Sequence, residues 1–141
     1  QRQMCIRDRA RARAHQIPVG LGTDVGGGTN FSLLATINEA YKVLQLNRQS
    51  LASTAALYLA TLGAANTLGI DDKVGSLEPG KEADFVVLDN AATALVERRI
   101  QTTTSIEDAL FVHMMLGDDR SVRATYILGE EAHRKHQAAR P

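Results

Sequence analysis

The stretch VGLGTDVGGGTNFS, residues 19–32, holds the side chain whose position most clearly suggests chemistry. Asp24 comes where an apolar segment ends, and three glycines, Gly26 to Gly28, follow shortly after it. A carboxylate at the carboxyl end of a strand in a β/α barrel points into the active site, where it can bind a divalent metal and accept a proton from water. Glycines behind it let the backbone turn sharply. Asp24 could instead cap the turn through an Asx-type hydrogen bond, and the residues alone leave both interpretations open.

A phosphate-binding loop is another common use of glycines between a strand and a helix. The dinucleotide pattern G-x-G-x-x-G would need a glycine at position 25, where the chain has Val25, and no G-K-[ST] follows. A carboxylate within such a loop would also repel phosphate. The sequence therefore argues against a nucleotide-phosphate site.

Histidine and cysteine supply no further metal site at the sequence level. No His-x-His pair occurs, and the histidines are His15 before the predicted strand, His113 in a predicted helix, and His133 and His136 in the tail. The single cysteine, Cys5, excludes an internal disulfide. Because a catalytic zinc normally needs three protein ligands, one carboxylate cannot hold it tightly.

The other polar residues that could take part in acid–base chemistry lie in predicted loops or on solvated helix faces. Acid–base catalysis needs such groups in a cleft that excludes water and shifts their pKa, so we expect structural or solvated roles for them. They are Thr23, Glu39, Lys42, Asp71, Asp72, Lys81, Glu82, Asp84, Asp118 and Asp119.

Acidic and basic residues balance at 16 each, but the charge is unevenly distributed. Residues 1–13 carry five arginines against one acid, whereas residues 14–132 carry 8 basic and 15 acidic side chains, a net charge of −7. This acidic body disfavours a nucleic-acid partner. No apolar run approaches the roughly 18–20 residues of a membrane span, and no signal peptide is recognisable, so we expect no membrane partner.

The elements that must position Asp24 can be predicted from apolar spacing and capping residues. Residues 17–24 read as a short strand. Leu34, Ile37, Tyr41 and Leu44 recur at helical spacing, which predicts a helix over residues 30–46.

A second helical region is predicted over residues 50–70. Ser50 is its expected N-cap, Gly63 marks an interruption, and Gly69 marks the end. The many alanines of this region suit close packing between helices.

The second half of the chain reads as strand, helix and strand. Glu78 to Lys81 predict a type II turn, and residues 85–88 a strand. Ser105 and Asp108 form an S-x-x-D capping box for a helix that ends at Gly117. The last strand is expected to place alternate residues on one face, and a polar, frayed tail should follow from Ala132. The alternate residues are Val122, Ala124, Tyr126 and Leu128.

Residues 19–43, VGLGTDVGGGTNFSLLATINEAYKV, resemble the last barrel strand and following helix of the guanine deaminases, a branch of the amidohydrolase superfamily. Residues 105–129, SIEDALFVHMMLGDDRSVRATYILG, resemble the same branch. Residues 59–89 carry a pattern that resembles one shared by many amidohydrolases, which indicates the superfamily but not the substrate. The resemblance covers about residues 13–130.

The resemblance implies a concrete chemistry. Guanine deaminases hydrolyse guanine to xanthine and ammonia on one zinc ion, which is held by a His-x-His pair, a further His and the Asp of G-T-D. Only the last ligand has a counterpart here, Asp24, which in the family also accepts a proton from the attacking water. The resemblance therefore implies that Asp24 is both metal ligand and catalytic residue, with Zn²⁺ as the cofactor. The departure from the family is the absence of the other ligands and of the proton-shuttling glutamate.

The expected fold class is α/β, the C-terminal part of a metal-dependent amidohydrolase TIM-like barrel with its last strand and outer helices, plus part of a small β-rich domain. We expect residues 1–12 to be a non-native or disordered leader, 13–70 the barrel piece, 71–130 the small domain with one helix, and 131–141 a polar tail. The β-rich domain would also receive strands from the N-terminal part of the enzyme. Alone, the fragment would be inactive.

The resemblance further implies a cytoplasmic enzyme of purine salvage or catabolism, homodimeric when full length, with guanine as its substrate. Two alternatives stay open. The chain could belong to another amidohydrolase acting on an amino- or chloro-substituted heterocycle. It could instead be a non-catalytic module that uses its helices for association.

Overall fold

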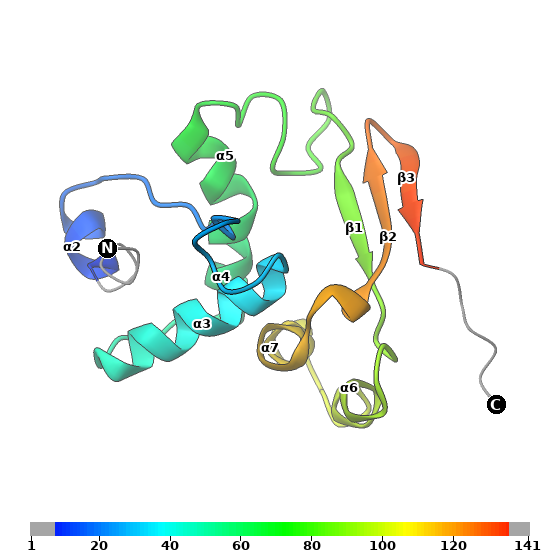
Figure 1. The fold of residues 1–141 in the computed structure, drawn as a ribbon. Helices are drawn as coiled ribbons and strands as arrows, with labels where there is room; N and C mark the ends of the chain where they lie inside the picture. Colours follow the sequence, from blue (N-terminus) through cyan, green and yellow to red (C-terminus); the bar gives the residue numbers. More distant parts are fainter. Residues whose placement is uncertain (1–7, 136–141) are drawn as a thin grey trace.

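The computed structural model describes residues 8–135, in which a group of helices precedes a small sheet with two further helices (Figure 1). The elements in chain order are α2 (Arg9–Ala14), α3 (Leu33–Leu46), α4 (Ser53–Ala60), α5 (Leu62–Leu68), β1 (Phe85–Leu88), α6 (Ala94–Ile100), α7 (Ile106–Leu116), a 3₁₀ turn (Asp119–Ser121), β2 (Val122–Ile127) and β3 (Glu130–Arg134). In Figure 1, α7 is seen end-on between α3 and α6, below the sheet.

The predicted helix after the glycine loop is confirmed as α3. Ser32 is its N-cap, and the Ser32 side chain accepts a hydrogen bond from the backbone N–H of Ala35. The apolar spacing turns Ile37, Ala40 and Leu44 inward, where all three are buried. This amphipathic face packs α3 against α4 and α7.

An aliphatic core joins these three helices to the segment before Asp24. Since the chain has no Trp and few aromatic residues, leucine and alanine fill the core and let the helices approach closely. The core consists of Leu21, Ile37, Ala40, Leu44, Leu51, Ala56, Leu59 and Met114.

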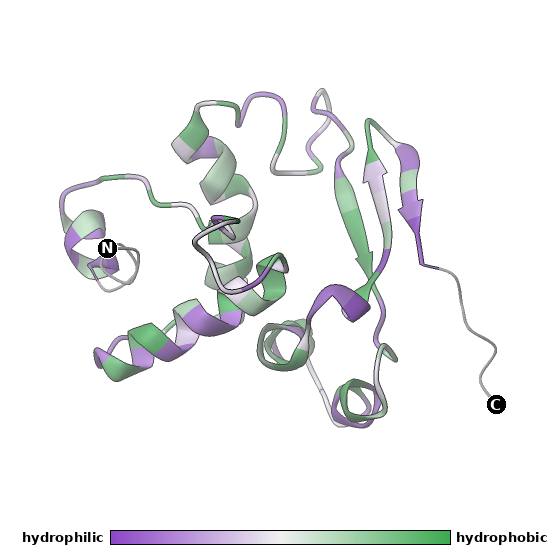
Figure 2. Ribbon diagram, in the orientation of Figure 1, coloured by the Kyte–Doolittle hydropathy of each residue, from purple (hydrophilic) through white to green (hydrophobic). Residues whose placement is uncertain are grey.

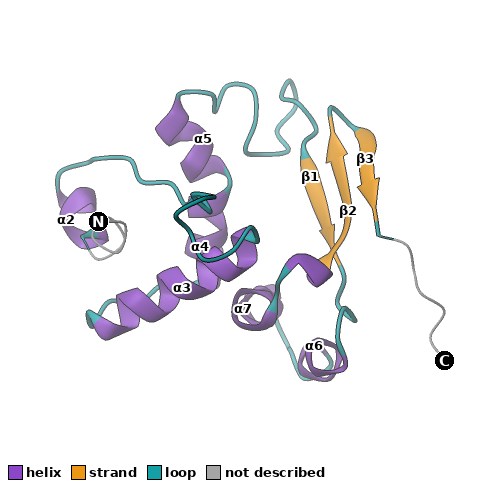
Figure 3. Cartoon of the chain, in the orientation of Figure 1, coloured by secondary structure: helices purple, strands orange, loops and turns teal. Residues whose placement is uncertain are grey.

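The strand predicted over residues 17–24 is not formed. The segment runs without regular secondary structure toward the glycine loop (Figure 3), held by the bond from the Leu21 N–H to the Leu59 carbonyl, 2.8 Å. An apolar segment becomes a strand only where a neighbouring strand takes up its backbone groups, and among residues 8–135 the sheet lies elsewhere. Leu21 is nevertheless buried, so the expected apolar anchor before Asp24 is present.

The second helical region is interrupted as expected, but its start was predicted wrongly. Ala52, not Ser50, occupies the N-cap position of α4, and no side chain caps this helix. The break falls at Thr61, where the backbone leaves helical angles between α4 and α5. Gly69 ends α5 in the left-handed conformation with φ of 69°, as predicted.

The sheet is three-stranded and antiparallel in the order β1-β2-β3. The turn before β1 is confirmed, because the Lys81 N–H bonds the Glu78 carbonyl at 3.2 Å and Gly80 has φ of 96°. Phe85 pairs with Tyr126, and their rings stack at 4.6 Å between centroids. A register shift follows Val87.

Leu128 does not continue the last predicted strand. β2 ends at Ile127, and Leu128 and Gly129 form a hairpin turn with φ of 54° and 78°. The Asp84 carboxylate accepts a hydrogen bond from the Leu128 N–H at 2.8 Å and the Ala83 carbonyl one from Gly129 at 3.0 Å, which fixes the turn.

The helix α6 and the strand β3 are among the elements that were not predicted. The helix α6 begins after Thr93, whose side chain accepts a hydrogen bond from the Val96 N–H at 3.2 Å, and it buries Val96. A capping threonine with Val96 and Ile100 one turn apart was the available signal. The strand β3 extends to Arg134, within the region predicted as a frayed tail, because β2 offers it an edge to pair with.

The ends of the chain differ partly from expectation. Helix α2, Arg9–Ala14, forms within a region that we expected to be a leader, and it buries no residue. Cys5 and His136 lie outside the described residues. No helix within residues 8–135 is long and apolar enough to cross a membrane.

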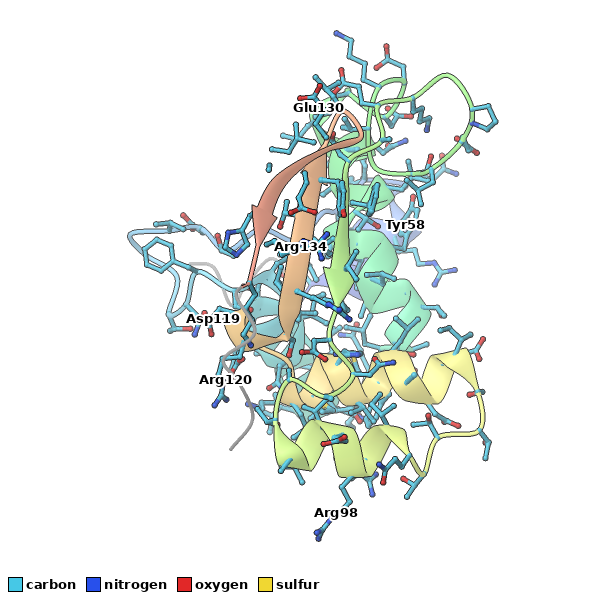
Figure 4. All side chains as sticks on the ribbon, turned by 90° about the vertical axis from the view of Figure 1, so that its right-hand side faces the viewer. Tyr58, Arg98, Asp119, Arg120, Glu130 and Arg134 are labelled. Carbon is cyan, nitrogen blue, oxygen red and sulfur yellow. The ribbon has the colours of Figure 1, made fainter. Side chains whose placement is uncertain are left out.

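Polar and apolar side chains are distributed differently over the three strands. β1 is apolar along its length whereas β3 is largely polar (Figure 2). Within residues 8–135 β1 pairs with β2 alone, and Val86 is 54% exposed. Charged residues such as Arg98, Asp119 and Glu130 lie on the outside (Figure 4).

Candidate functional site

Asp24 lies at the start of a tight turn. Its backbone has φ of 49°, a left-handed conformation that a non-glycine residue seldom adopts. The Asp24 carbonyl accepts hydrogen bonds from the N–H groups of Gly27 at 3.0 Å and Gly28 at 2.6 Å. Main-chain bonds thus close the turn, and the Asp24 residue itself is exposed.

Two of the glycines are required by this turn. Gly26 has φ of 95°, which disfavours any residue with a side chain. A Cβ at Gly28 would overlap the carbonyl oxygen of Thr23. The prediction that glycines turn the backbone sharply behind Asp24 is therefore confirmed, and the turn presents Asp24 at the surface.

The elements on both sides fix the turn to the core. Before it, Leu21 is buried beside Leu59, and a Cβ at Gly20 would lie 2.6 Å from the Ala64 Cα. After it, the Ser32 N–H donates to the Asn30 side chain at 2.7 Å, which leads the chain into α3. Asp24 is therefore an exposed carboxylate on a segment anchored at both ends.

Within residues 8–135, no histidine belongs to a group of three metal-ligating side chains with Asp24. His15 follows α2, His133 lies exposed on β3, and His113 is buried in α7, where its Nε2 lies 2.8 Å from the Asn90 Oδ1. Burial lowers the pKa of the His113 imidazole, although the charge of Asp89 partly opposes that shift. His113 is thus a neutral structural histidine at neutral pH, as expected.

Residues 8–135 do not by themselves fit a zinc ion. No three His, Cys, Asp or Glu side chains of this part of the chain come close enough together to hold a metal. Three protein ligands are the usual minimum for a catalytic zinc, and Asp24 offers one carboxylate.

The remaining carboxylates have structural surroundings. Glu39 and Lys42 form an exposed ion pair at 2.9 Å on α3. Asp118 caps the 3₁₀ turn and pairs with Arg120 at 2.6 Å, and the hydrogen bonds from that guanidinium hold the pKa of the Asp118 carboxyl below its ordinary value. These contacts agree with the structural roles expected of them.

Sequence reasoning missed a long-range contact of the helix that follows the Asp24 loop. Asn38 of α3 donates from Nδ2 to the Met115 carbonyl of α7 at 2.8 Å. The two residues are 77 positions apart, and a lone asparagine within a helical pattern gives no signal of such a contact.

The chain belongs to the amidohydrolase family, whose sequence pattern matches residues 6–132. The chain is also 53% identical over 119 residues to the guanine deaminase of Escherichia coli strain K12, an alignment that covers 84% of this chain and 27% of that protein. The resemblance seen in the sequence is therefore confirmed. The match begins at residue 6, so part of the expected leader matches the family.

Solved structures support the same family. The structure of the E. coli guanine deaminase superimposes with a TM-score of 0.88 at 49% identity, covering 91% of this chain and 30% of that chain. An adenosine deaminase from Xanthomonas campestris, described with bound zinc, superimposes with a TM-score of 0.69 at 25% identity, covering 87% of this chain and 27% of that one. The chain thus spans about a third or less of the proteins it matches.

Proposed function

We propose that this chain is the C-terminal part of a zinc-dependent guanine deaminase. The observation that carries the proposal is the 53% identity to the E. coli guanine deaminase, together with an exposed Asp24 on a segment anchored at both ends. The reaction adds water to the purine carbon that bears the amino group and breaks the carbon–nitrogen bond. The products are xanthine and ammonia.

In this proposal Asp24 is one ligand of the zinc ion, and the other ligands come from parts of the protein outside residues 8–135. Zinc supplies Lewis-acid chemistry when bound. Asp24 accepts the proton of the attacking water, because a carboxylate close to the metal is both negatively charged and basic. The zinc named in the Xanthomonas adenosine deaminase supports the choice of metal.

The proposed architecture follows the same reasoning. Residues 17–24 are the last strand of a TIM-like barrel, which becomes a regular strand when neighbouring barrel strands accept its backbone groups. The apolar β1, with Val86 54% exposed, accepts a strand from the N-terminal part of the enzyme at its second edge. We propose residues 13–70 as the barrel piece and 71–130 as the small domain.

We also propose that the full-length enzyme is a cytoplasmic homodimer of purine salvage or catabolism that needs neither nucleic acid nor membrane. The net charge of −7 over residues 14–132 supports the exclusion of nucleic acid.

The experiment that tests the function is Asp24→Asn in the full-length protein. The variant keeps the size of the side chain and removes its charge and basicity. We expect kcat for guanine to fall on the order of 10²–10⁴-fold. Bound zinc should fall with it, whereas the melting temperature should stay close to that of the parent, because an exposed side chain contributes little to packing.

The control is Asp72→Asn, the same change in an exposed loop carboxylate outside the proposed site. It should leave kcat, zinc content and melting temperature unchanged. The loss of a general base should lower kcat by more than about tenfold. If Asp24→Asn retains full zinc and more than about a tenth of the parent kcat, Asp24 does not have the proposed role.

A second candidate function is deamination of another amino-substituted purine. The similarity to the Xanthomonas adenosine deaminase, with a TM-score of 0.69, favours it as the runner-up. Turnover of adenosine faster than guanine by the full-length protein would decide for this alternative.

A further inference from the structure

The C-terminal end of α7 contacts the first half of α3, the helix that follows the Asp24 loop. The Asn38 Nδ2 donates to the Met115 carbonyl at 2.8 Å, one and a half turns into α3. One turn earlier, the Leu34 Cδ1 lies 2.9 Å from the position that a Cβ would take at Gly117, so the missing side chain at Gly117 lets the helices approach.

The contact continues along both helices in antiparallel order. The rings of Tyr41 and Phe111 meet edge to face at 5.6 Å between centroids. At the other end of α7, the Ser53 hydroxyl of α4 donates to the Glu107 carbonyl at 2.9 Å. The helix α7 therefore contacts both α3 and α4, the helices whose residues form the core with Leu21.

The chemistry of Asn38 indicates more than packing. Met115 is among the last residues of α7, where carbonyl groups lack a partner within the helix, so the Asn38 amide satisfies one of them. Its own Oδ1 is buried and has no hydrogen-bond partner among the described residues. A buried amide with an unsatisfied oxygen is destabilising, so an apolar side chain would serve pure packing better.

Hydrogen bonds also connect the first turn of α3 to Asn30, at the end of the Asp24 loop. The Thr36 hydroxyl donates to the Ser32 carbonyl at 3.1 Å, and the Ala35 N–H donates to the Ser32 side chain at 3.4 Å. The Ser32 N–H in turn binds the Asn30 side chain at 2.7 Å. Whatever fixes the first two turns of α3 therefore also fixes the end of the loop.

We propose that Asn38 is a positioning residue, whose bond to the Met115 carbonyl fixes the start of α3 against α7 and so fixes the loop that presents Asp24. The position of the loop follows from the structure alone. The consequence for catalysis rests on the proposed function, in which Asp24 binds the metal.

Amide hydrogen exchange on the full-length protein tests the loop directly, without substrate. In Asn38→Leu, which keeps the number and branching of the side-chain heavy atoms and removes the donor, we expect faster exchange at Gly27 and Gly28, whose N–H groups bind the Asp24 carbonyl, and at Ala35. The expected increase is about five- to tenfold, the effect of losing one intramolecular hydrogen bond. Amides that pair β1 with β2 should exchange at the parent rate.

The matched control is Asn66→Leu, the same substitution at an exposed position of α5. It should change none of these rates. Should Asn38→Leu fail to fold, Leu34→Ala weakens the same interface from the next turn and should accelerate Gly27 and Gly28 in the same way. If faster exchange is confined to the end of α7, around Gly117, Asn38 only caps that helix, and the proposal is wrong.

A kinetic measurement on the full-length protein adds the catalytic consequence. A displaced Asp24 loop should lower kcat for guanine several-fold at an unchanged KM, since positioning of a reacting group acts mainly on the chemical step. If the loop amides exchange faster while kcat stays at the parent value, Asn38 positions the loop but Asp24 does not have the proposed catalytic role. Unchanged exchange overturns the positioning role itself.

Discussion

At the scale of single residues, the glycines near Asp24 differ in whether the surrounding atoms leave room for a side chain. Gly28 has an ordinary φ, yet a Cβ there would overlap the Thr23 carbonyl. At Gly22, six residues earlier, no heavy atom lies within 4 Å of the position that a Cβ would take. Comparing substitutions at the two positions therefore distinguishes a glycine that is needed for lack of space from one that is not.

We expect Gly28→Ala to destabilise the chain by about 1–3 kcal/mol, the usual range for forcing extra atoms into a filled space. Gly22→Ala should change the free energy of unfolding by less than about 0.5 kcal/mol, as exposed substitutions usually do. Urea unfolding of both variants measures the difference. Equal stability of the two variants would show that the turn can relax around a side chain at position 28.

His113 predicts a dependence of stability on pH. Burial lowers its pKa in the folded chain below the ordinary value, which is about 6.5. The unfolded chain therefore binds a proton first as the pH falls, so this contribution to stability is fully present above about pH 6.5 and decreases below it, down to the folded pKa.

The measurement is the free energy of unfolding between pH 5 and 8, compared with that of His113→Leu. The variant should show a smaller decrease below about pH 6.5 than the parent. His133→Gln, a change at an exposed histidine of β3, should keep the slope of the parent. If the free energy of unfolding of His113→Leu falls with pH as steeply as that of the parent, other groups cause the pH dependence.

At the scale of elements, a side-chain cap marks the start of α7 but not the start of α4. The Ser105 side chain accepts a hydrogen bond from the Asp108 N–H at 3.1 Å, and the Asp108 carboxylate accepts one from the Thr104 hydroxyl at 3.2 Å. Hydrogen bonds to the Asp108 carboxylate from the Ser105 side chain and from the backbone and side chain of Thr104 lower the pKa of this carboxyl. Ser50, by contrast, lies outside α4, whose N-cap is Ala52.

We therefore expect Ser105→Ala to cost about 1 kcal/mol of stability, the usual effect of losing a side-chain cap. Ser50→Ala should cost less than about 0.5 kcal/mol, because no cap is lost. Both values follow from urea unfolding at one pH. A larger loss of stability for Ser50→Ala than for Ser105→Ala would contradict the finding that Ser105 caps a helix and Ser50 does not.

At the scale of the whole molecule, the proposed site takes one carboxylate, Asp24, from residues 8–135, and the chain spans 27% of the E. coli relative. A single carboxylate would hold zinc weakly, so the proposed function needs further ligands from other parts of the protein.

We predict that the isolated 141-residue chain does not convert guanine to xanthine in the presence of zinc. The measurement follows xanthine formation, with the same zinc solution without protein as the blank. The full-length protein is the positive control. Turnover by the isolated chain above the blank would show that it completes a catalytic site by itself.

Local interactions explain what the sequence alone determined. The α3 helix, the turn at Gly80 and the α7 cap at Ser105 depend on residues within four positions of one another, so spacing and side-chain type predict them. Asp24 was identified in the same way, from an apolar segment and the glycines behind it. The family resemblance then supplied the proposed chemistry of this residue.

Contacts between distant residues decided the rest. The segment 17–24 lacks a neighbouring strand within residues 8–135, β3 forms because β2 offers it an edge, and Leu128 turns because Asp84 and Ala83 bind the backbone there. Asn38 and Met115 are 77 residues apart in the chain. A pattern within one segment does not contain its partners, so only the tertiary structure fixed these features and the link from α7 to the Asp24 loop.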